Sequence, residues 1–461
     1  MLSPWKVKGI HMQFNNADIE KLVSRTLIIE CFEITLTQNS ESSPLIFNGP
    51  GSITIEPDGK LSLKMYDATK KSSMSEMMRV AFYQGTGVVA ESEYFSLCAK
   101  DSSGNLWFAP RVFINDGLQL TPHGTIINFY IPEIRTDRAH RRVDLDGLSI
   151  ANIVISGRYR LPFNKFEDQA DGSASVTGLE FEIENGEITL SQKAKHLAVD
   201  IVSKNLEIDH DFIIKISEAL SIAIGREAWP AYYRVYKSGM LSSFINGKSD
   251  VSGLGMVRPL VDVFPYKTAK LITFVNQYTN NRKKEHDHIV YYWRRLYYIS
   301  SKVTDVAALV LTVNIEGLIN NYFRDGRAPS DKIMGEIGLS RKLIDPLRLP
   351  GSTNSRIKNV LGAMKKLTAP NILRELADEG RISTAHVKSW NNLRHSLAHA
   401  GNTDSNPAAI NVFIEDINNC LDLFYHLIGL SVGYDASLIG ESELLTPAEA
   451  KDVAAKQLAL F

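Results

Sequence analysis

The change of hydrophobic period near residue 200 limits the fold more than any other feature of this sequence. Before it, stretches such as "TLIIECFEITLT" (26–37) and "GLEFEIENGEITL" (178–190) alternate apolar and polar residues, as strands do when one face of a sheet is buried. Turn pairs such as Asp58-Gly59 separate these stretches. We therefore expect residues 1–200 to form an antiparallel β sandwich or barrel.

After this point the apolar residues recur with the period of an α-helix. The first clear amphipathic helix is "DHDFIIKISEALSIAIG" (209–225), for which Asp209 or Asp211 can serve as the N-cap. A chain of 461 residues is longer than one typical domain, so we expect an α+β multidomain protein. The expected divisions are a β-rich domain (1–200), a helical linker domain (201–299), a helical bundle (300–432) and a C-terminal tail (433–461).

The bundle is expected to end in two long helices, of which the first spans roughly residues 384–400. The second begins with Asn406 as N-cap and Pro407 at the first helical position, a favoured pairing at helix starts. Its predicted apolar stripe consists of Ile410, Phe413, Ile417, Leu421, Phe424 and Ile428. In the tail, Thr446 and Glu449 form a capping box, which predicts a short terminal helix.

Cysteine usage and hydropathy indicate a soluble cytoplasmic protein. Cys31, Cys98 and Cys420 lie far apart, with neither a disulfide framework nor the spacing of metal ligands. The N-terminus lacks the apolar core of a secretory signal. The longest apolar stretch is interrupted by Asn314 and Glu316, so it is shorter than the roughly 20 residues of a membrane helix. We expect no membrane association and no bound cofactor or metal.

A basic segment lies inside the expected bundle. The net charge of −1 argues against a general polyanion binder. Residues 341–370, however, contain seven basic side chains and a single acid, Asp345. The segment is either an electrostatic footprint for RNA or DNA or the solvated face of a helix and its loop. The candidate RNA-binding residues are Arg341, Lys342, Arg348, Arg356, Lys358, Lys365 and Lys366.

An arginine lies on the expected core side of the helix 384–400. With 3.6 residues per turn, Arg394 falls inside the apolar stripe of this helix. That stripe consists of Val387, Trp390, Leu393 and Leu397. Because an unpaired buried charge is costly, Arg394 needs a carboxylate, backbone carbonyls or a bound anion as its partner.

Two histidines follow this arginine on the opposite face of the helix. His395 and His399 belong to the sequence "VKSWNNLRHSLAHAGNTDSNP", in which Gly401 suits the end of a helix. Arg394 and His399 can converge only if the helix end unwinds or if two copies of the chain meet. These residues are either ordinary polar groups at a helix terminus or a site that handles phosphate.

The segment "LRHSLAHAG", followed by a polar loop and a long final helix, resembles the signature of HEPN ribonucleases. That signature is an arginine, then a polar residue, and a histidine a few positions later, and it maps onto Arg394, His395 and His399. The family also has an earlier helix with an acid among apolar residues, and "AALVLTVNIEGLINNYF" (307–323) with Glu316 is similar to it. The whole layout resembles ApeA-like bacterial antiphage defence proteins.

The resemblance implies metal-independent RNA cleavage, in which a 2′-hydroxyl attacks the adjacent phosphate and leaves a cyclic phosphate and a 5′-hydroxyl. His399 would then accept or deliver a proton, and Arg394 would hold the phosphate oxygens and stabilise the developing charge. His395 would assist proton transfer or orient the phosphate. Glu316 would orient Arg394, and its alternative role is a structural ion pair inside the bundle.

The resemblance also implies partners. Related domains build a composite site across a two-fold axis, so we expect a homodimer. The expected substrate is RNA, and the resemblance favours transfer RNA, which members of the family commonly cleave. A phage-derived protein is the expected trigger of a toxin-like antiphage response, with the β-rich domain sensing the trigger or positioning RNA.

Two other functions are compatible with the sequence. The first is a non-catalytic HEPN module that binds RNA, nucleotides or protein as an adaptor, and the presence of both Arg394 and His399 favours the nuclease over it. In the second, the β-rich domain is the functional part and binds a ligand or a protein, while the helices serve as a dimerisation platform.

Overall fold

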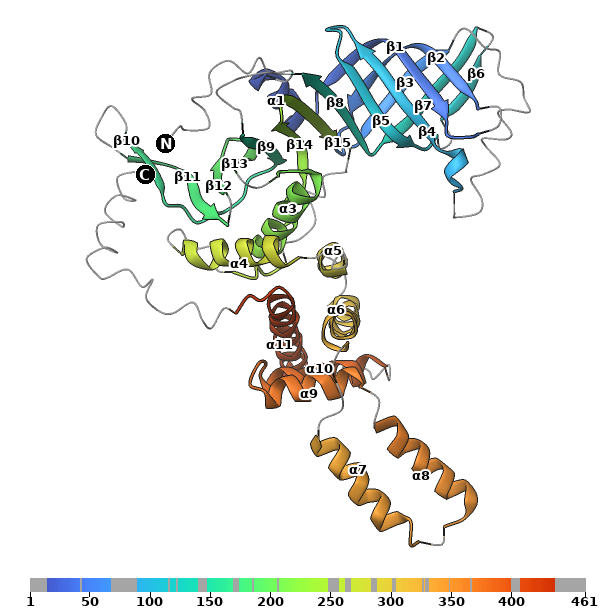
Figure 1. The fold of residues 1–461 in the computed structure, drawn as a ribbon, viewed down its shortest axis with the longest axis vertical. Coiled ribbons are helices and arrows are strands. Elements are labelled where there is room, and N and C mark those ends of the chain that lie inside the picture. The colour runs from blue at the N-terminus through green and yellow to red at the C-terminus, as the bar shows by residue number, and fades with distance from the viewer. Residues whose placement is uncertain are drawn as a thin grey trace. The chain divides into compact units, whose positions relative to one another are not determined.

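The computed structural model describes most of the chain (Figure 1). The described residues are 15–41, 44–67, 89–114, 117–121, 123–139, 147–168, 174–184, 186–204, 207–247, 257–261, 267–282, 288–300, 304–325, 327, 331–347, 349–364, 367–398 and 407–435. The chain forms two compact units, one built on residues up to Gly253 and the other on Thr273–Glu441. The first unit carries all of the described strands, and the second is helical.

The first unit is built on one antiparallel sheet of 15 strands in the order β10-β11-β12-β13-β9-β14-β15-β8-β5-β4-β1-β2-β3-β7-β6. The strands are β1 (Ile28–Gln38), β2 (Ile46–Ile55), β3 (Leu61–Asp67), β4 (Phe95–Asp101), β5 (Leu106–Val112), β6 (Leu118–Thr121), β7 (Gly124–Ile131), β8 (Glu133–Ala139), β9 (Ser149–Ser156), β10 (Lys165–Asp168), β11 (Ala174–Ile183), β12 (Gly186–Gln192), β13 (His196–Ser203), β14 (Pro230–Lys237) and β15 (Met240–Asn246). Helix α1 (Asn16–Val23) precedes β1, and the short turn η3 (Glu91–Glu93) precedes β4. The expected antiparallel β-rich N-terminal region is confirmed. Across the described residues the sheet is open, so a closed barrel, one of the two expected forms, is wrong.

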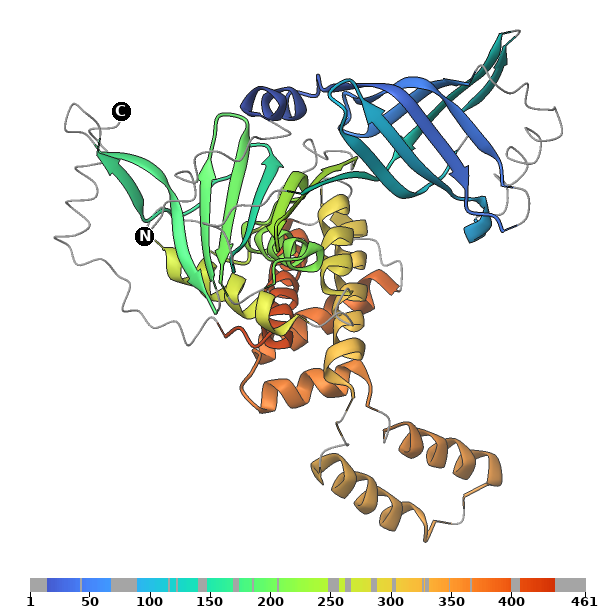
Figure 2. The ribbon, with the colours of Figure 1, turned by 45° about the horizontal axis from the view of Figure 1, so that its top comes forward.

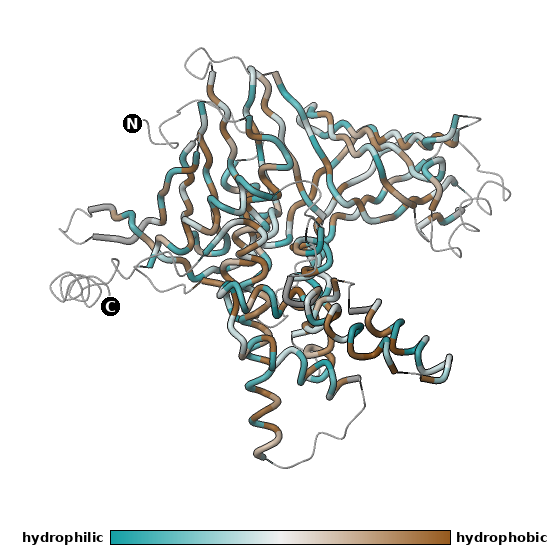
Figure 3. The backbone as a smooth tube through the Cα atoms, turned by 60° about the horizontal axis from the view of Figure 1, so that its bottom comes forward, coloured by the Kyte–Doolittle hydropathy of each residue, from teal (hydrophilic) through white to brown (hydrophobic). Residues whose placement is uncertain are grey.

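Strands β1 to β8 form a curled half of this sheet. β7 and β8 are separated only by Pro132, yet β7 pairs with β3 while β8 pairs with β15 and β5. Proline has no N–H for a strand ladder, so the chain changes its pairing there. Along β7 every second residue is buried, an alternation that Figure 3 displays as brown and teal along the strands. The main core of the unit lies here and includes the buried side chains of Ile34, Leu36 and Trp107.

The other half of the sheet is buried on both faces along β12 and β13. Helix α3 (His210–Ile224) packs against this half (Figure 2), and most of its side chains are buried. Asp209, one of the two predicted caps, is the N-cap, because its side chain accepts a hydrogen bond from Phe212 N at 2.8 Å. Gly225 adopts the left-handed conformation with φ of 68° and ends the helix.

A row of polar side chains crosses this half of the sheet. The row consists of register-matched partners on β12, β13, β9, β14, β15 and β8, namely Thr189, Asp200, Asn152, Arg234, Ser243 and Thr136. Asn152 donates through Nδ2 to Asp200, and Arg234 Nε donates to Asn152 Oδ1 at 2.7 Å. Asp200 is only 4% exposed, and burial raises the pKa of its carboxyl group. The charged form of this carboxylate is therefore destabilised by its surroundings.

Residues 230–246 correct the expectation that the region 201–299 is a helical linker. They form the hairpin β14–β15, whose strands also pair with β9 and β8. Its turn contains Ser238 at φ 50° and Gly239 at φ 77°, the two left-handed residues that a tight hairpin turn requires. Burial along β14 is nearly continuous rather than alternating, so its apolar residues lack the period of two that reveals a half-buried strand.

The second unit is helical. Its helices are α5 (His288–Ile299), α6 (Thr304–Leu318), α7 (Asp331–Ile344), α8 (Gly351–Met364), α9 (Ala369–Asp378), α10 (Thr384–Ala398) and α11 (Pro407–Ser431), and α4 (Thr268–Asn281) leads into it. α6 continues directly into a π-helical segment, η6 (Ile319–Phe323). α5, α6, α9, α10 and α11 pack into one bundle (Figure 2), whereas α7 and α8 pair with each other. The expected helical C-terminal region is confirmed.

The N-terminal half of α11 is more exposed than its apolar stripe predicts. Phe424 and Ile428 are fully buried, but Ile410 is 43% exposed, and Val412 and Ile414 are exposed as well. Figure 3 shows this end of the helix mainly in brown. The predicted apolar stripe is therefore buried toward the end of the helix, at Phe424 and Ile428, and exposed at its first residue, Ile410. The described side-chain hydrogen bonds from α10 reach α11 only in its later turns.

Residues Thr304–Phe323 form the one helical stretch, among those that the structure describes, that is long and apolar enough to cross a membrane. Its mean hydropathy is 1.3, and 44% of the apolar window is buried inside the unit. α6 packs against α5, α10 and α11, which is the position of a core helix. The predicted N-cap Asn406 and the predicted capping box of Thr446 and Glu449 lie outside the described residues.

Candidate functional site

The indole of Trp390 anchors α10 to α6. This side chain is fully buried, and its Nε1 donates a hydrogen bond to the carbonyl oxygen of Thr312 at 3.3 Å. Val387 and Leu393 are also buried, so these residues of the predicted core face of α10 are confirmed. A buried indole with its N–H satisfied determines which face of α10 meets α6.

One turn further along both helices, Arg394 meets Glu316. Nη2 of Arg394 lies 3.6 Å from Oε2 of Glu316, which is longer than the ~2.8 Å of a charge-assisted hydrogen bond. The two side chains are 47% and 38% exposed. The guanidinium also lies over the ring of Trp390, with its carbon 5.3 Å from the ring centroid. Arg394 is therefore held by an ion pair and a cation–π contact.

Arg394 is not the buried arginine that the helical pattern predicts. Its side chain starts beside the core face but extends over the Trp390 ring toward solvent, so the charge remains hydrated. The carboxylate that it meets is that of Glu316, the acid that the family resemblance assigns to it.

His395 is exposed in the last turn of α10, next to Arg394 in the sequence. His399 and Gly401 lie outside the described residues, as does the polar loop up to the start of α11. Of the predicted catalytic residues, the structure thus brings Arg394 and Glu316 together and leaves His395 at the same helix end.

The turn of α6 that carries Glu316 is packed tightly against α5. A Cβ atom on Gly317 would lie 2.4 Å from the Tyr292 ring, so a larger residue there would force the ring to move. Asn314 Nδ2 donates to the carbonyl oxygen of Tyr292 at 2.8 Å, and Asn321 Nδ2 donates to its hydroxyl at 3.1 Å. These contacts hold the Glu316 turn and the start of η6, a rare helix form that is frequent at functional sites.

Two polar contacts set the alignment of α10 and α11. Asn392 Nδ2 donates to Asp416 Oδ2 at 3.3 Å, and Asn419 Nδ2 donates to Ser389 Oγ at 3.1 Å. Buried polar groups are normally paired, so these contacts favour one register of the two helices. The sequence analysis did not find them, because the partners are 24 and 30 residues apart.

Two histidines that the sequence analysis did not single out also meet between these helices. The ring centroids of His386 in α10 and His426 in α11 lie 5.3 Å apart, with the ring planes at 52°. Burial lowers the pKa of both imidazoles, and the neighbouring His426 lowers the pKa of His386 further. Both rings are consequently held in their neutral form near pH 7.

The predicted basic segment lies on the α7–α8 pair. Arg341 and Lys342 are exposed at the end of α7, and Arg356 and Lys358 are exposed on α8. Arg348, Lys365 and Lys366 lie outside the described residues. The four described cations therefore present their charge to solvent, which both readings of this segment require.

The described residues contain no group of three or more His, Cys, Asp or Glu side chains that could hold a metal ion. Cys31 and Cys420 are buried, and burial raises the pKa of each thiol to about 12. Such thiols stay protonated near neutral pH and are poor nucleophiles.

Comparisons with protein-family models, with curated proteins and with solved structures found no match. Among the described residues, the arrangement that best suits a functional site is the contact of Arg394 on α10 with Glu316 on α6, beside the buried Trp390.

Proposed function

We propose that this protein is a metal-independent endoribonuclease of the HEPN type. The observation that carries the proposal is the contact between Arg394 and Glu316, which stand 78 positions apart in the sequence as the arginine of the signature and the acid of the preceding helix. A chance match to a short motif does not require these two residues to meet.

The state of Arg394 suits phosphate binding. Its contacts with described residues are the 3.6 Å ion pair and the Trp390 ring, so the planar fork of N–H donors remains available to an incoming anion. A guanidinium binds two phosphate oxygens at once and stabilises the charge that develops on them. Glu316 and Trp390 would position this group without neutralising its donors.

The reaction follows from the residue types at this helix end. His399 accepts the proton of the ribose 2′-hydroxyl as its oxygen forms a bond to the adjacent phosphorus. The bond from phosphorus to the 5′-oxygen breaks, and His395 donates a proton to that leaving oxygen. The products are a 2′,3′-cyclic phosphate and a 5′-hydroxyl.

We infer that two copies of the chain form the working enzyme. Ile410 and Ile414, which lie one turn apart on the same face of α11 and are exposed, follow shortly after His399 in the sequence. A patch of this kind on a surface helix is typical of an interface. A homodimer through this segment would let Arg394 of one copy act beside His399 of the other.

The other parts of the chain supply recognition and control in this proposal. The exposed cations of α7 and α8 would bind the phosphates of the RNA substrate, for which transfer RNA is the first candidate. The β-rich unit would sense a trigger such as a phage-derived protein, or position RNA, in an antiphage response in the cytoplasm.

The test is to sequence RNA fragments with 5′-hydroxyl ends after induction of the wild type, Arg394→Ala and His399→Ala. New ends are expected only with the wild type. Lys388→Ala is the matched control and should cleave as the wild type does, because this exposed lysine lies on the same helix outside the site. Equal cleavage by all variants would refute the assignment. Absence of cleavage together with retained RNA binding would favour the non-catalytic adaptor.

A further inference from the structure

The second unit contains a polar pocket that the proposed reaction does not use. Its volume is about 300 Å³, the lower end of the range for small-molecule sites. The lining residues are Asn321, Tyr322, Phe323, Asp325, Arg327, Arg381, Leu430 and Ser431. They come from η6 and the turn after it, from the segment between α9 and α10, and from the end of α11.

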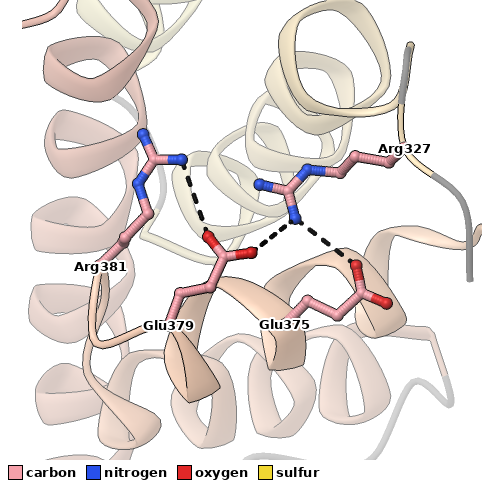
Figure 4. A network of polar contacts seen from close by, with 4 residues as sticks. All are labelled: Arg327, Glu375, Glu379 and Arg381. Atoms are coloured by element: carbon pink, nitrogen blue, oxygen red, sulfur yellow. Dashed lines mark hydrogen bonds and ion pairs between the residues drawn. The ribbon is translucent and has the colours of Figure 1, made fainter. Parts of the chain in front are cut away.

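Two arginines on the pocket wall share one carboxylate. Nη1 of Arg327 lies 3.2 Å from Glu379 and 3.5 Å from Glu375, and Nη1 of Arg381 lies 3.8 Å from the other oxygen of Glu379. Figure 4 shows both guanidinium groups directed toward the carboxylate of Glu379. The negative charge of Glu379 offsets the repulsion between the two guanidinium groups and so keeps them near each other.

Most of the N–H donors of these two arginines make no hydrogen bond to the residues that the structure describes. Arg327 donates only through Nη1 to described residues. The 3.8 Å separation between Arg381 and Glu379 exceeds hydrogen-bond length, so the guanidinium of Arg381 makes no hydrogen bond within the described chain. The described residues that line the pocket include two cationic side chains, Arg327 and Arg381, and one anionic side chain, Asp325. The lining therefore carries a net positive charge.

We propose that this pocket binds a small-molecule phosphate monoester. Two adjacent guanidinium forks match the oxygens of a phosphate group, and the shared carboxylate of Glu379 is the group that such an anion would displace. The side chains of Tyr322 and Phe323 add an aromatic part to the lining, which suits an organic group attached to the phosphate. The volume accommodates a phosphosugar or a mononucleotide rather than a polymer.

The position of the pocket connects it to the candidate nuclease site. Residues Asn321, Tyr322 and Phe323 belong to η6, which continues α6 directly after the turn of Glu316. Asn321 also donates to the Tyr292 hydroxyl, against which Gly317 packs. A ligand that shifts η6 would therefore move the turn that positions Glu316 beside Arg394. This regulatory part rests on the proposed nuclease function, whereas the binding itself does not.

Binding is tested by calorimetry on the full-length Arg394→Ala protein, which separates it from any RNA cleavage. The probes are ribose 5-phosphate and AMP, with adenosine as the uncharged control and inorganic phosphate to measure the anion alone. Arg381→Gln is expected to weaken the binding of both monoesters about tenfold, the effect of one lost charge-assisted hydrogen bond. Glu379→Gln is expected to tighten it, because the competing carboxylate is gone.

Arg374→Gln is the matched control, since this α9 arginine donates to Asn371 at 3.0 Å and is not among the described residues that line the pocket. It should leave binding unchanged. Failure of both monoesters to bind at millimolar concentration, or equal affinities of the wild-type pocket and Arg381→Gln, would overturn the site. In a second arm, AMP is expected to change the RNA cleavage rate of the wild type but not of Arg381→Gln. If the wild-type protein binds the monoesters but cleaves no RNA, the proposed nuclease function is refuted and the proposed binding site is not.

Discussion

Nη2 of Arg394 on α10 lies 3.6 Å from Oε2 of Glu316 on α6, one turn beyond the buried hydrogen bond from Trp390 to Thr312. The two helices are thus joined by a buried contact and, beside it, by an ion pair that is open to solvent. Burial of Trp390 holds the helices together, so the ion pair is not needed for that purpose. Arg394 can therefore be altered with little effect on folding, and this separates function from stability.

Arg394→Ala is expected to abolish RNA cleavage while the protein stays folded. A solvent-exposed ion pair contributes at most about 1 kcal/mol to stability, whereas loss of a group that stabilises transition-state charge reduces rates by about 100-fold or more. Cleavage of total transfer RNA and urea unfolding measure the two effects. Unfolding of the variant at much lower urea would show that Arg394 is a structural residue.

Glu316→Gln tests whether the carboxylate acts through Arg394. The substitution keeps the size of the side chain and removes its charge, so cleavage is expected to fall about tenfold, which corresponds to about 1.4 kcal/mol. The double variant Glu316→Gln with Arg394→Ala should cleave no more slowly than Arg394→Ala alone. Once the guanidinium of Arg394 is absent, Glu316 has no group left to orient. Independent, additive losses would refute this coupling.

Charge reversal on α7 is expected to weaken RNA binding without affecting the site. For Arg341→Glu with Lys342→Glu, the dependence of affinity on salt should become shallower by about one unit per lost phosphate contact. Filter binding across a salt series measures this. The matched control is Lys64→Glu on β3 of the first unit, where the side chain is exposed. An unchanged salt slope would assign the α7 cations to a solvated face.

The His386–His426 pair is expected to make the second unit sensitive to acid. Because burial lowers the folded-state pKa of each imidazole below the ordinary histidine value of 6.5, the unfolded chain binds protons first as the pH falls. The contribution of the pair to stability is complete above about pH 6.5 and decreases below it. Thermal unfolding between about pH 5 and 8 should show a smaller loss for His386→Gln with His426→Gln. If the double variant loses as much thermal stability as the wild type when the pH is lowered, the histidine pair is not the cause of the acid sensitivity.

Asp200→Asn is expected to stabilise the first unit at neutral pH. Burial raises the folded-state pKa of Asp200 above the ordinary aspartate value of 3.8, so stability falls as the pH rises from that value through the folded-state pKa. Asparagine keeps an acceptor for Asn152 and removes the charge, and each unit of pKa shift corresponds to about 1.4 kcal/mol. The gain should disappear near pH 4, where aspartic acid is itself neutral. Destabilisation at pH 7 would mean that Arg234 needs the charged partner.

The sequence by itself determined the parts of this protein that depend on neighbouring residues. The alternation before residue 200 and the helical period after it predicted the β-rich and helical regions, and Asp209 was correctly named among the caps of α3. Hydrophobic period and capping act over one or two turns, so they are visible in a local stretch. The helical period also singled out Arg394, although it predicted the wrong environment for this arginine, whereas Glu316 was named through the family resemblance.

The tertiary structure alone decided which distant residues meet. Strand register assembles the row containing Asp200, helix packing brings His386 to His426, and the ends of three segments place Arg327 beside Arg381. The periodicity of the sequence does not reveal any of these pairs, because each pair forms only when whole faces of a sheet or helix pack together. The start of α11 shows the opposite outcome. Its apolar sequence predicts burial, but these residues are exposed among the described parts of one chain.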